Sequence, residues 1–200
     1  MHDSKQKIFK AAETLFARKG YDRVSVVEIA SKAKISKSLI FHYFKSKEKI
    51  LIDLIKKKLE EFEYLLTESL KNETPRKKLE SFIDNYLNLI ARQTDFFKIL
   101  FRETLSSNKK ITELIIRHNA RIASTIRLII EEGKELGDFR PDVDTESFSI
   151  LLTTLLNSTA AIKALQSLKP KPFQLNFKNL KAEIKKLMIE RILSHAGENC

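Results

Sequence analysis

Apolar residues recur along most of the chain at intervals of three and four positions, as at Leu79, Phe82, Ile83 and Tyr86. This spacing places them on one face of an α-helix. Only four glycines and four prolines interrupt the pattern. No run alternates apolar and polar residues, as a half-buried strand would. The pattern therefore predicts an all-α protein of about nine helices.

The breaks between these segments coincide with residues that begin or end helices. Gly20 follows the first segment, Thr74 and Pro75 open the fifth, and Asn176 precedes the last. Threonine and asparagine cap helix starts, proline suits the first turn, and glycine suits the position after the end. The predicted helices cover residues 4–19, 26–33, 37–45, 47–71, 75–90, 95–105, 109–135, 144–168 and 177–192.

The second and third predicted helices are joined by a connection of about three residues. Ser25 and Glu28 form a capping box before the second helix, and Ser36 suits the N-cap of the third. Ile40 and Phe44 are four apart, so they share one face and can anchor the third helix on a core. Two capped helices with so short a turn predict a helix-turn-helix.

The other face of the third helix carries hydrogen-bond donors, two aromatic rings and no acid. Such a face suits base-pair edges and the phosphates beside them. Taken alone, it fits the solvated side of a short surface helix better than a DNA-reading face. Including the caps and the residue after the helix, the candidate DNA-binding residues are Ser25, Ser36, Lys37, Ser38, Leu39, Phe41, His42, Tyr43 and Lys47.

At this point the sequence resembles the TetR/AcrR family of bacterial transcriptional regulators, over roughly its first quarter. Two positions depart from the family pattern: Lys34 stands where glycine is usual, and Phe41 stands where tyrosine is usual. If the backbone of Lys34 is left-handed, its side chain costs on the order of 1 kcal/mol. The residues that carry the resemblance are Ile8, Ala11, Ala12, Leu15, Phe16, Gly20, Ile29, Ala30, Ala33, Ile35, Ser36, Phe44, Lys47, Glu48 and Ile50.

Positive charge is concentrated in the same part of the chain. Residues 1–47 hold 11 Lys and Arg against 4 Asp and Glu, whereas the other 153 residues hold 26 against 22. The whole chain has a formal net charge of +11, of which +7 lies in those first 47 residues. A polyanion-binding surface requires this kind of concentration. We therefore expect a DNA-binding domain over residues 1–47, and the resemblance implies a ligand-binding and dimerisation domain over residues 48–200.

The resemblance implies a homodimeric repressor that binds double-stranded DNA at a palindromic operator. It also implies a pocket within the fourth to eighth helices, where a small apolar molecule triggers release from DNA. The alternative is a DNA-binding protein without small-molecule control that acts through a protein partner. The candidate ligand-binding residues are Phe96, Phe97, Phe101, Arg102, His118 and Asn119.

Each of these ligand candidates also has a plainer interpretation. The phenylalanines suit a hydrophobic core better than a ligand cage, and Arg102 with Glu103 fits a surface pair. His118 fits a core histidine bonded to a neighbour as well as a ligand contact.

The resemblance further implies that the last two helices of each subunit form a four-helix dimer interface. The eighth predicted helix is the most apolar and has apolar or small residues on more than one side, so a second helix could cover it. The candidate interface residues are Thr153, Thr154, Asn157, Ala161, Ile184 and Met188.

Nothing in the sequence predicts catalysis, a metal site or a cofactor. The four histidines are scattered, and neither a Cys-x-x-Cys motif nor a glycine-rich phosphate loop is present. The one cysteine, Cys200, is the last residue, which fits a reducing cytoplasm. No uninterrupted apolar stretch approaches the ~20 residues of a membrane span, and the first residues do not resemble a signal peptide. We therefore expect a cytoplasmic protein, with binding to a membrane surface or another protein as the rival to DNA binding.

Overall fold

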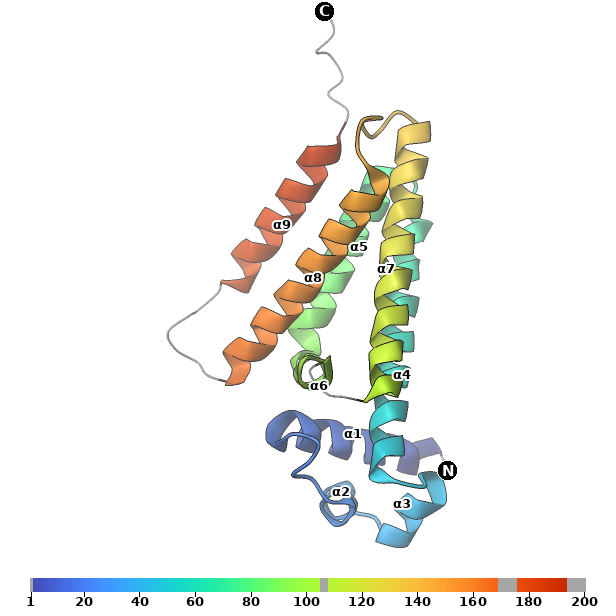
Figure 1. Ribbon diagram of the computed structural model, residues 1–200, viewed down its shortest axis with the longest axis vertical. Coiled ribbons are helices and arrows are strands. Elements are labelled where there is room, and N and C mark those ends of the chain that lie inside the picture. Colours follow the sequence, from blue (N-terminus) through green and yellow to red (C-terminus); the bar gives the residue numbers. More distant parts are fainter. Residues whose placement is uncertain (1, 105–107, 169–175, 194–200) are drawn as a thin grey trace, which may run out of the picture. The chain divides into compact units, whose positions relative to one another are not determined.

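The computed structural model describes residues 2–104, 108–168 and 176–193, and in this part of the chain it confirms the all-α prediction. Nine α-helices and one 3-10 helix are present there, and no strand, although an isolated β-bridge joins Phe139 and Leu193 (Figure 1). The elements are α1 (His2–Lys19), α2 (Val26–Ala33), α3 (Lys37–Tyr43), α4 (Lys47–Thr67), η1 (Glu68–Lys71), α5 (Pro75–Arg92), α6 (Thr94–Thr104), α7 (Lys109–Glu135), α8 (Thr145–Leu168) and α9 (Phe177–Ile192).

These elements form two compact units. The first unit comprises residues 1–60 and 93–115, so it holds α1–α3, most of α4, α6 and the start of α7. The second comprises residues 61–92 and 116–200, and it holds η1, α5, α8, α9 and the remaining parts of α4 and α7. The functional boundary that we placed at residue 47 stays a prediction.

In the first unit, α6 packs on α1 although it lies about 80 residues further along the chain. The Nη1 atom of Arg102 on α6 donates hydrogen bonds to the carbonyls of Phe16 at 3.0 Å and Ala17 at 2.8 Å. Carbonyls in the last turn of a helix have no partner within that helix. Arg102 therefore closes the C-terminal end of α1.

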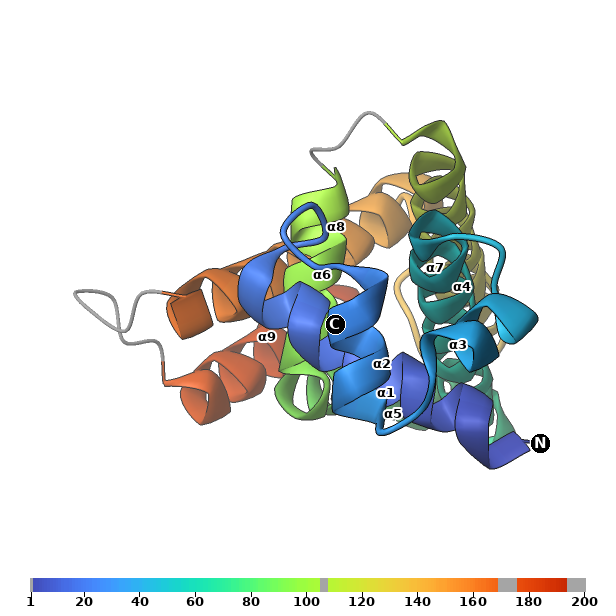
Figure 2. The same cartoon turned by 90° about the horizontal axis from the view of Figure 1, so that it is seen from below.

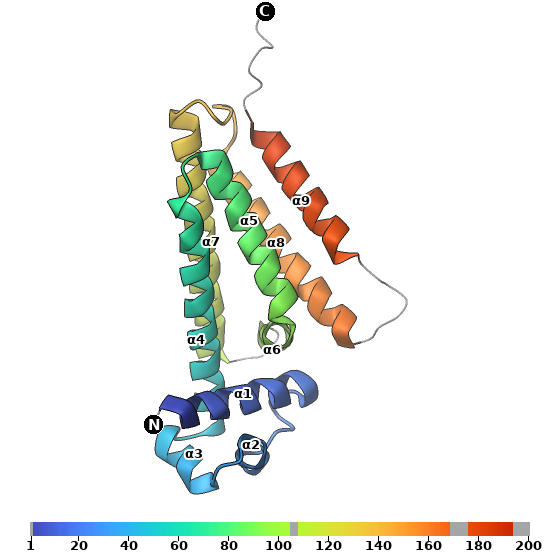
Figure 3. The same cartoon turned by 180° about the vertical axis from the view of Figure 1, so that it is seen from behind.

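In the second unit, α8 and α9 both pack on α5 (Figure 3). Besides the apolar contacts, Asp84 on α5 accepts a hydrogen bond from Lys185 at 2.8 Å and pairs with Lys181 at 3.2 Å, both on α9. The helical spacing of Leu180, Ile184, Leu187, Met188 and Ile192 predicts that all five face inward, but Leu187 is 64% exposed. Ile189 is buried instead, since α9 is rotated on α5 so that the buried stripe leaves out Leu187.

The turn between α7 and α8 is locked onto the end of α9. The amide of Phe139 donates to the carbonyl of Gly133 at 3.0 Å, and the amide of Arg140 donates to the carbonyl of Ile192 at 2.9 Å. The ring of Phe139 is fully buried and lies so close to Gly133 that a β-carbon there would be 2.0 Å from its Cδ2 atom. Only glycine fits at position 133 without a shift of the ring.

Helix α8 is long and apolar enough to cross a membrane by length and composition, with a mean hydropathy of 1.4 over its most apolar window. Part of this helix faces the interior, and 44% of that window is buried. The buried hydroxyls of Ser149 and Thr153 donate hydrogen bonds to carbonyls one turn earlier in the same helix. These features are those of a core helix that packs against α5.

Candidate nucleic-acid interface

The start of α2 is built by the predicted capping box. The hydroxyl of Ser25 accepts a hydrogen bond from the amide of Glu28 at 3.1 Å, and the amide of Ser25 donates to Glu28 at 2.8 Å. Lys19, in the last turn of α1, donates to the same carboxylate at 2.6 Å. The bond from Lys19 and then those from Ser25 lower the pKa of Glu28 to about 2. The carboxylate therefore stays ionised and ties α2 to the end of α1.

The turn between α2 and α3 contains a strained residue. Lys34 has φ 56° and ψ 46°, the left-handed conformation, and is the one residue other than glycine with positive φ in the described ranges. Its amide and that of Ile35 satisfy the free carbonyls of Ala30 and Ser31 at the end of α2. The local geometry is thus the one in which glycine is usual, and lysine occupies it.

Helix α3 is held at both ends and through its middle. The hydroxyl of Ser36 accepts from the amide of Leu39 at 3.1 Å and so caps the helix. Ile40 and Phe44 are each 1% exposed, and the ring of Phe44 packs on that of Phe9 of α1 at 5.3 Å between centroids. These contacts confirm the anchoring face that the four-residue spacing predicted.

Helix α3, whose ribbon is labelled in Figure 2, carries most of the candidate DNA-binding residues. Lys37, Ser38, Phe41 and His42 are exposed, whereas Leu39 and Tyr43 are half-buried. The ammonium of Lys37 lies 5.8 Å from the centre of the Phe41 ring, and the rings of His42 and Tyr43 meet edge to face. The face contains no carboxylate, so a phosphate backbone would meet no like charge on it.

Lys47, the ninth candidate, has a contact that sequence reasoning missed. Its ammonium donates to the carbonyls of Tyr21 at 2.9 Å and Asp22 at 3.4 Å, and it stands 4.1 Å from the centre of the Tyr21 ring. Burial, and then the charge of Glu48, raise the pKa of the Tyr21 hydroxyl. Lys47 therefore joins the start of α4 to the loop between α1 and α2, and its contact with DNA stays a prediction.

The six ligand-binding candidates are divided between the units. Phe96 and Phe97 are buried in the first unit and Phe101 is half-buried there, while Arg102 is engaged at the end of α1. His118 and Asn119 belong to the second unit.

The imidazole of His118 is buried beside a carboxylate in the second unit. Its Nδ1 lies 3.3 Å from Glu63, whose carboxylate also pairs with Arg121. Burial is the main cause that lowers the pKa of His118, against the opposing effect of Glu63. Burial therefore favours the neutral form of the ring. A core histidine bonded to a neighbour describes this arrangement, and a ligand contact stays a prediction.

A second polar cluster in this unit, made of one buried tyrosine and two half-buried asparagines, includes two residues that were not singled out for a ligand site. The hydroxyl of Tyr86 donates to Asn157 at 2.7 Å, and the amide of Asn157 donates to Asn119 at 3.1 Å. Tyr86 is 2% exposed, and this burial raises the pKa of its hydroxyl. The sequence signal for this cluster was Asn157, an asparagine within the most apolar helix. We had assigned Asn157 to the dimer interface.

Most of the dimer-interface candidates lie inside a single copy of the second unit. Thr153, Ile184 and Met188 are buried, and Asn157 belongs to the cluster just described. Thr154 is exposed and Ala161 half-buried. Large apolar side chains are nevertheless exposed on these two helices. They are Ile150, Leu151 and Leu165 on α8 and Leu187 on α9.

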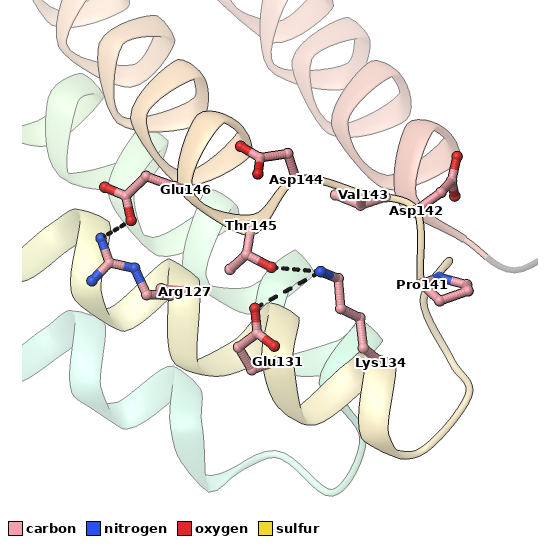
Figure 4. Close-up of a pocket in the computed structure, with 9 residues that line it drawn as sticks. All are labelled: Arg127, Glu131, Lys134, Pro141, Asp142, Val143, Asp144, Thr145 and Glu146. Atoms are coloured by element: carbon pink, nitrogen blue, oxygen red, sulfur yellow. Dashed lines mark hydrogen bonds and ion pairs between the residues drawn. The ribbon is translucent and has the colours of Figure 1, made fainter.

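A cleft of about 570 Å³ lies between the end of α7 and the start of α8 (Figure 4). Lys134 donates to the hydroxyl of Thr145 at 2.7 Å and is 3.8 Å from Glu131, and Arg127 pairs with Glu146. These charges are paired with one another, which is the arrangement of a structural ion-pair cluster. Among the described residues, no group of three or more histidine, cysteine or acidic side chains could hold a metal ion.

Comparison with known proteins places this arrangement in a family. Residues 8–54 match the family model described as bacterial regulatory proteins, tetR family, and residues 72–161 match the tetracyclin repressor-like C-terminal domain. The fatty acid metabolism regulator protein of Bacillus subtilis is 29% identical over 139 residues, which make up 69% of this chain and 72% of that protein.

Solved structures share the fold over nearly the whole chain. The transcriptional regulator FadR from Bacillus subtilis, in complex with stearoyl-CoA, has a TM-score of 0.77 at 23% identity over 92% of this chain and 97% of its own. The fatty acid degradation regulator FadR from Bacillus halodurans has a TM-score of 0.76 at 21% identity with the same coverage. With both family models matched in order, this chain belongs to the TetR family of bacterial regulatory proteins, so it is a DNA-binding transcriptional regulator and not an enzyme.

Proposed function

We propose that this regulator is a cytoplasmic homodimeric repressor that reads a palindromic operator through α3 and is released by a small apolar molecule. The observation that carries this proposal is the face of α3. The helix is capped by Ser36 and anchored through Ile40 and Phe44. Its outward face exposes Lys37, Ser38 and His42 and contains no acid. The N-terminal residues of a recognition helix contact base edges in helix-turn-helix complexes.

The DNA-binding part of the proposal predicts sequence-specific losses from substitutions on α3. In Lys37→Ala and His42→Ala, affinity for the selected operator should fall by ~1–3 kcal/mol, because a direct base contact discriminates by about that amount. The operator is first obtained by selecting bound sequences from random DNA. Fluorescence titrations of operator and random duplexes then separate base contacts from phosphate contacts.

Lys77 on α5 offers a matched control, because it is exposed, lies in the second unit and is outside the proposed dimer face. Lys77→Ala should leave both titrations unchanged. Equal losses on operator and random DNA for Lys37→Ala and His42→Ala would remove the two residues from base reading. Failure of the wild-type protein to select any sequence would overturn the proposed function.

Dimerisation is supported by the exposed apolar side chains of α8 and α9. Leu151, Thr154 and Leu165 recur at helical spacing on α8, and Leu187 is exposed on α9. In a helix of 3.6 residues per turn, spacings of 3, 11 and 14 residues return to roughly the same face. We infer that this face, together with the half-buried Ala161, meets its equivalent in a second copy.

Release by a ligand is supported by the uncharged polar groups within the second unit. Tyr86, Asn119 and Asn157 form a hydrogen-bonded cluster in which the tyrosine is buried, and His118, next to Asn119 in the sequence, is also buried. Apolar sites with a few polar groups are typical of ligand pockets. Since a regulator of the same fold is solved in complex with stearoyl-CoA, the first molecule to test on this chain is a long-chain acyl-CoA, whose acyl chain supplies the apolar part.

Ligand control predicts a reciprocal effect between effector and DNA. A coupling free energy of about 1–3 kcal/mol would lower operator affinity roughly 5- to 150-fold, and operator DNA would weaken effector binding by the same factor. Calorimetric titration of stearoyl-CoA into the protein, with and without operator, measures this factor. Binding with equal affinity in both titrations would contradict release by this ligand. It would favour the alternative of a DNA-binding protein that acts through a protein partner.

A further inference from the structure

A groove lined by lysines lies in the first unit, between α1 and the C-terminal end of α2. Its volume is about 400 Å³, and four of its lining residues are Lys7, Lys10, Lys32 and Lys34. All four side chains are exposed. We refer to this feature as the lysine groove, which is separate from the outward face of α3.

The charge of the lysine groove is largely uncompensated. Lys7 pairs with Asp3 one turn earlier at 2.5 Å. In the part of the chain that the structure describes, the ammonium groups of Lys10, Lys32 and Lys34 have neither an ion-pair nor a hydrogen-bond partner. Like charges gathered on one surface repel each other, so such a group is favourable when it meets an anion.

The backbone of Lys34 gives a second, independent indication. Its left-handed conformation carries a steric cost that glycine would avoid. The hydrogen bonds that end α2 use only backbone atoms of Lys34, so glycine would make them equally well. The lysine side chain therefore has no evident role in the fold, and strained residues are concentrated at functional sites.

The place of the groove in the motif indicates which anion it meets. Lys34 stands two residues before Ser36, the N-cap of the recognition helix. In helix-turn-helix complexes, the recognition helix enters the major groove while the helix before it crosses the phosphate backbone. The end of α2 and the adjoining part of α1 would then face that backbone.

We propose that the lysine groove binds backbone phosphates of DNA beside the bases that α3 reads, and that Lys34 keeps its strained conformation because its ammonium completes this site. The inference rests on DNA binding by α3, as proposed above. It adds to the protein a sequence-independent contact surface on α1 and α2. Such contacts strengthen all DNA complexes alike and set the register of the recognition helix.

The sharpest test is Lys34→Gly, because the stability of the protein should be kept or increased while its affinity for DNA should fall. Removal of the strain should leave the melting temperature unchanged or raise it. Affinity for operator and random DNA should both fall, and the slope of log affinity against log salt should decrease by about one unit for each phosphate that the variant no longer neutralises. On raising the salt from 50 to 200 mM, the advantage of the wild type should shrink about 3- to 4-fold per phosphate.

Companion variants make the assignment specific. Lys10→Gln and Lys32→Gln should each reduce the slope in the same way, and Lys34→Arg should retain the wild-type slope because it retains the charge. Lys77→Gln on α5 is the control with an equal change of charge, and it should alter nothing.

Two outcomes separate this inference from the proposed function. If wild-type protein selects an operator but Lys34→Gly binds it with unchanged affinity and slope, the lysine groove does not bind DNA, and the reading by α3 stands. If Lys34→Gly lowers affinity only on the operator, with an unchanged slope, the side chain acts on a base and the phosphate assignment is wrong. Absence of DNA binding by the wild type would instead overturn the proposed function itself.

Discussion

Replacing Gly133 with alanine should destabilise the protein by about 2 kcal/mol, which is the upper end of the overpacking cost less the helix gain of alanine. Overpacking a filled core costs typically 1–3 kcal/mol, and here the new methyl group would lie 2.0 Å from the Phe139 ring. Alanine favours a helix over glycine by about 1 kcal/mol, which offsets only part of this cost. The displaced ring would also disturb the bond between Arg140 and Ile192 that holds the end of α9. Thermal unfolding should show a fall in melting temperature of about 4–8 °C for a chain of this size.

The control for this prediction is Gly133→Ala made in a Phe139→Ala protein. In Phe139→Ala the ring is absent, so Gly133→Ala should be neutral or stabilising there. The two measurements form a double-mutant cycle, and their difference isolates the interaction between the two positions. If Gly133→Ala lowers the melting temperature equally in both backgrounds, a cause other than the Phe139 ring is at work.

Placing a charge on the exposed face of α8 should dissociate the proposed dimer. In Leu151→Glu, two carboxylates would enter an apolar interface, where burying an unpaired charge is costly. Operator affinity should fall about 100-fold or more although α3 is untouched. The reason is that a monomer loses the effective concentration that its partner provides at the second half-site. Light scattering measures the dimer, and a fluorescence titration with operator DNA measures the affinity.

A matched control for this prediction lies on α7. Leu128 has the same side chain and the same exposure as Leu151, 65% for each. Leu128→Glu should stay dimeric and keep its operator affinity. A Leu151→Glu protein that remains dimeric would place the interface on another surface, and equal dissociation by both variants would point to unfolding of the second unit.

The sequence by itself determined the helices and their ends, because caps and turns are local. The bonds of Ser25 with Glu28 and of Ser36 with Leu39 join residues three positions apart. Spacing alone also predicted that Ile40 and Phe44 would be buried and that the other side of α3 would face outward. These features depend on a few neighbouring residues and on the period of the helix, so they can be read from the chain directly.

The tertiary structure decided which side chains form hydrogen bonds with residues from distant parts of the chain. Arg102 closes the end of α1 from 85 positions away, and Asn157 meets Tyr86 across 71 positions. Lys47 turns to the carbonyl of Tyr21, 26 positions earlier. Such contacts depend on how helices dock and rotate on one another, as does the burial of Ile189 in place of Leu187. A helical period identifies an apolar stripe, but the packing of a whole unit selects which edge of that stripe is covered.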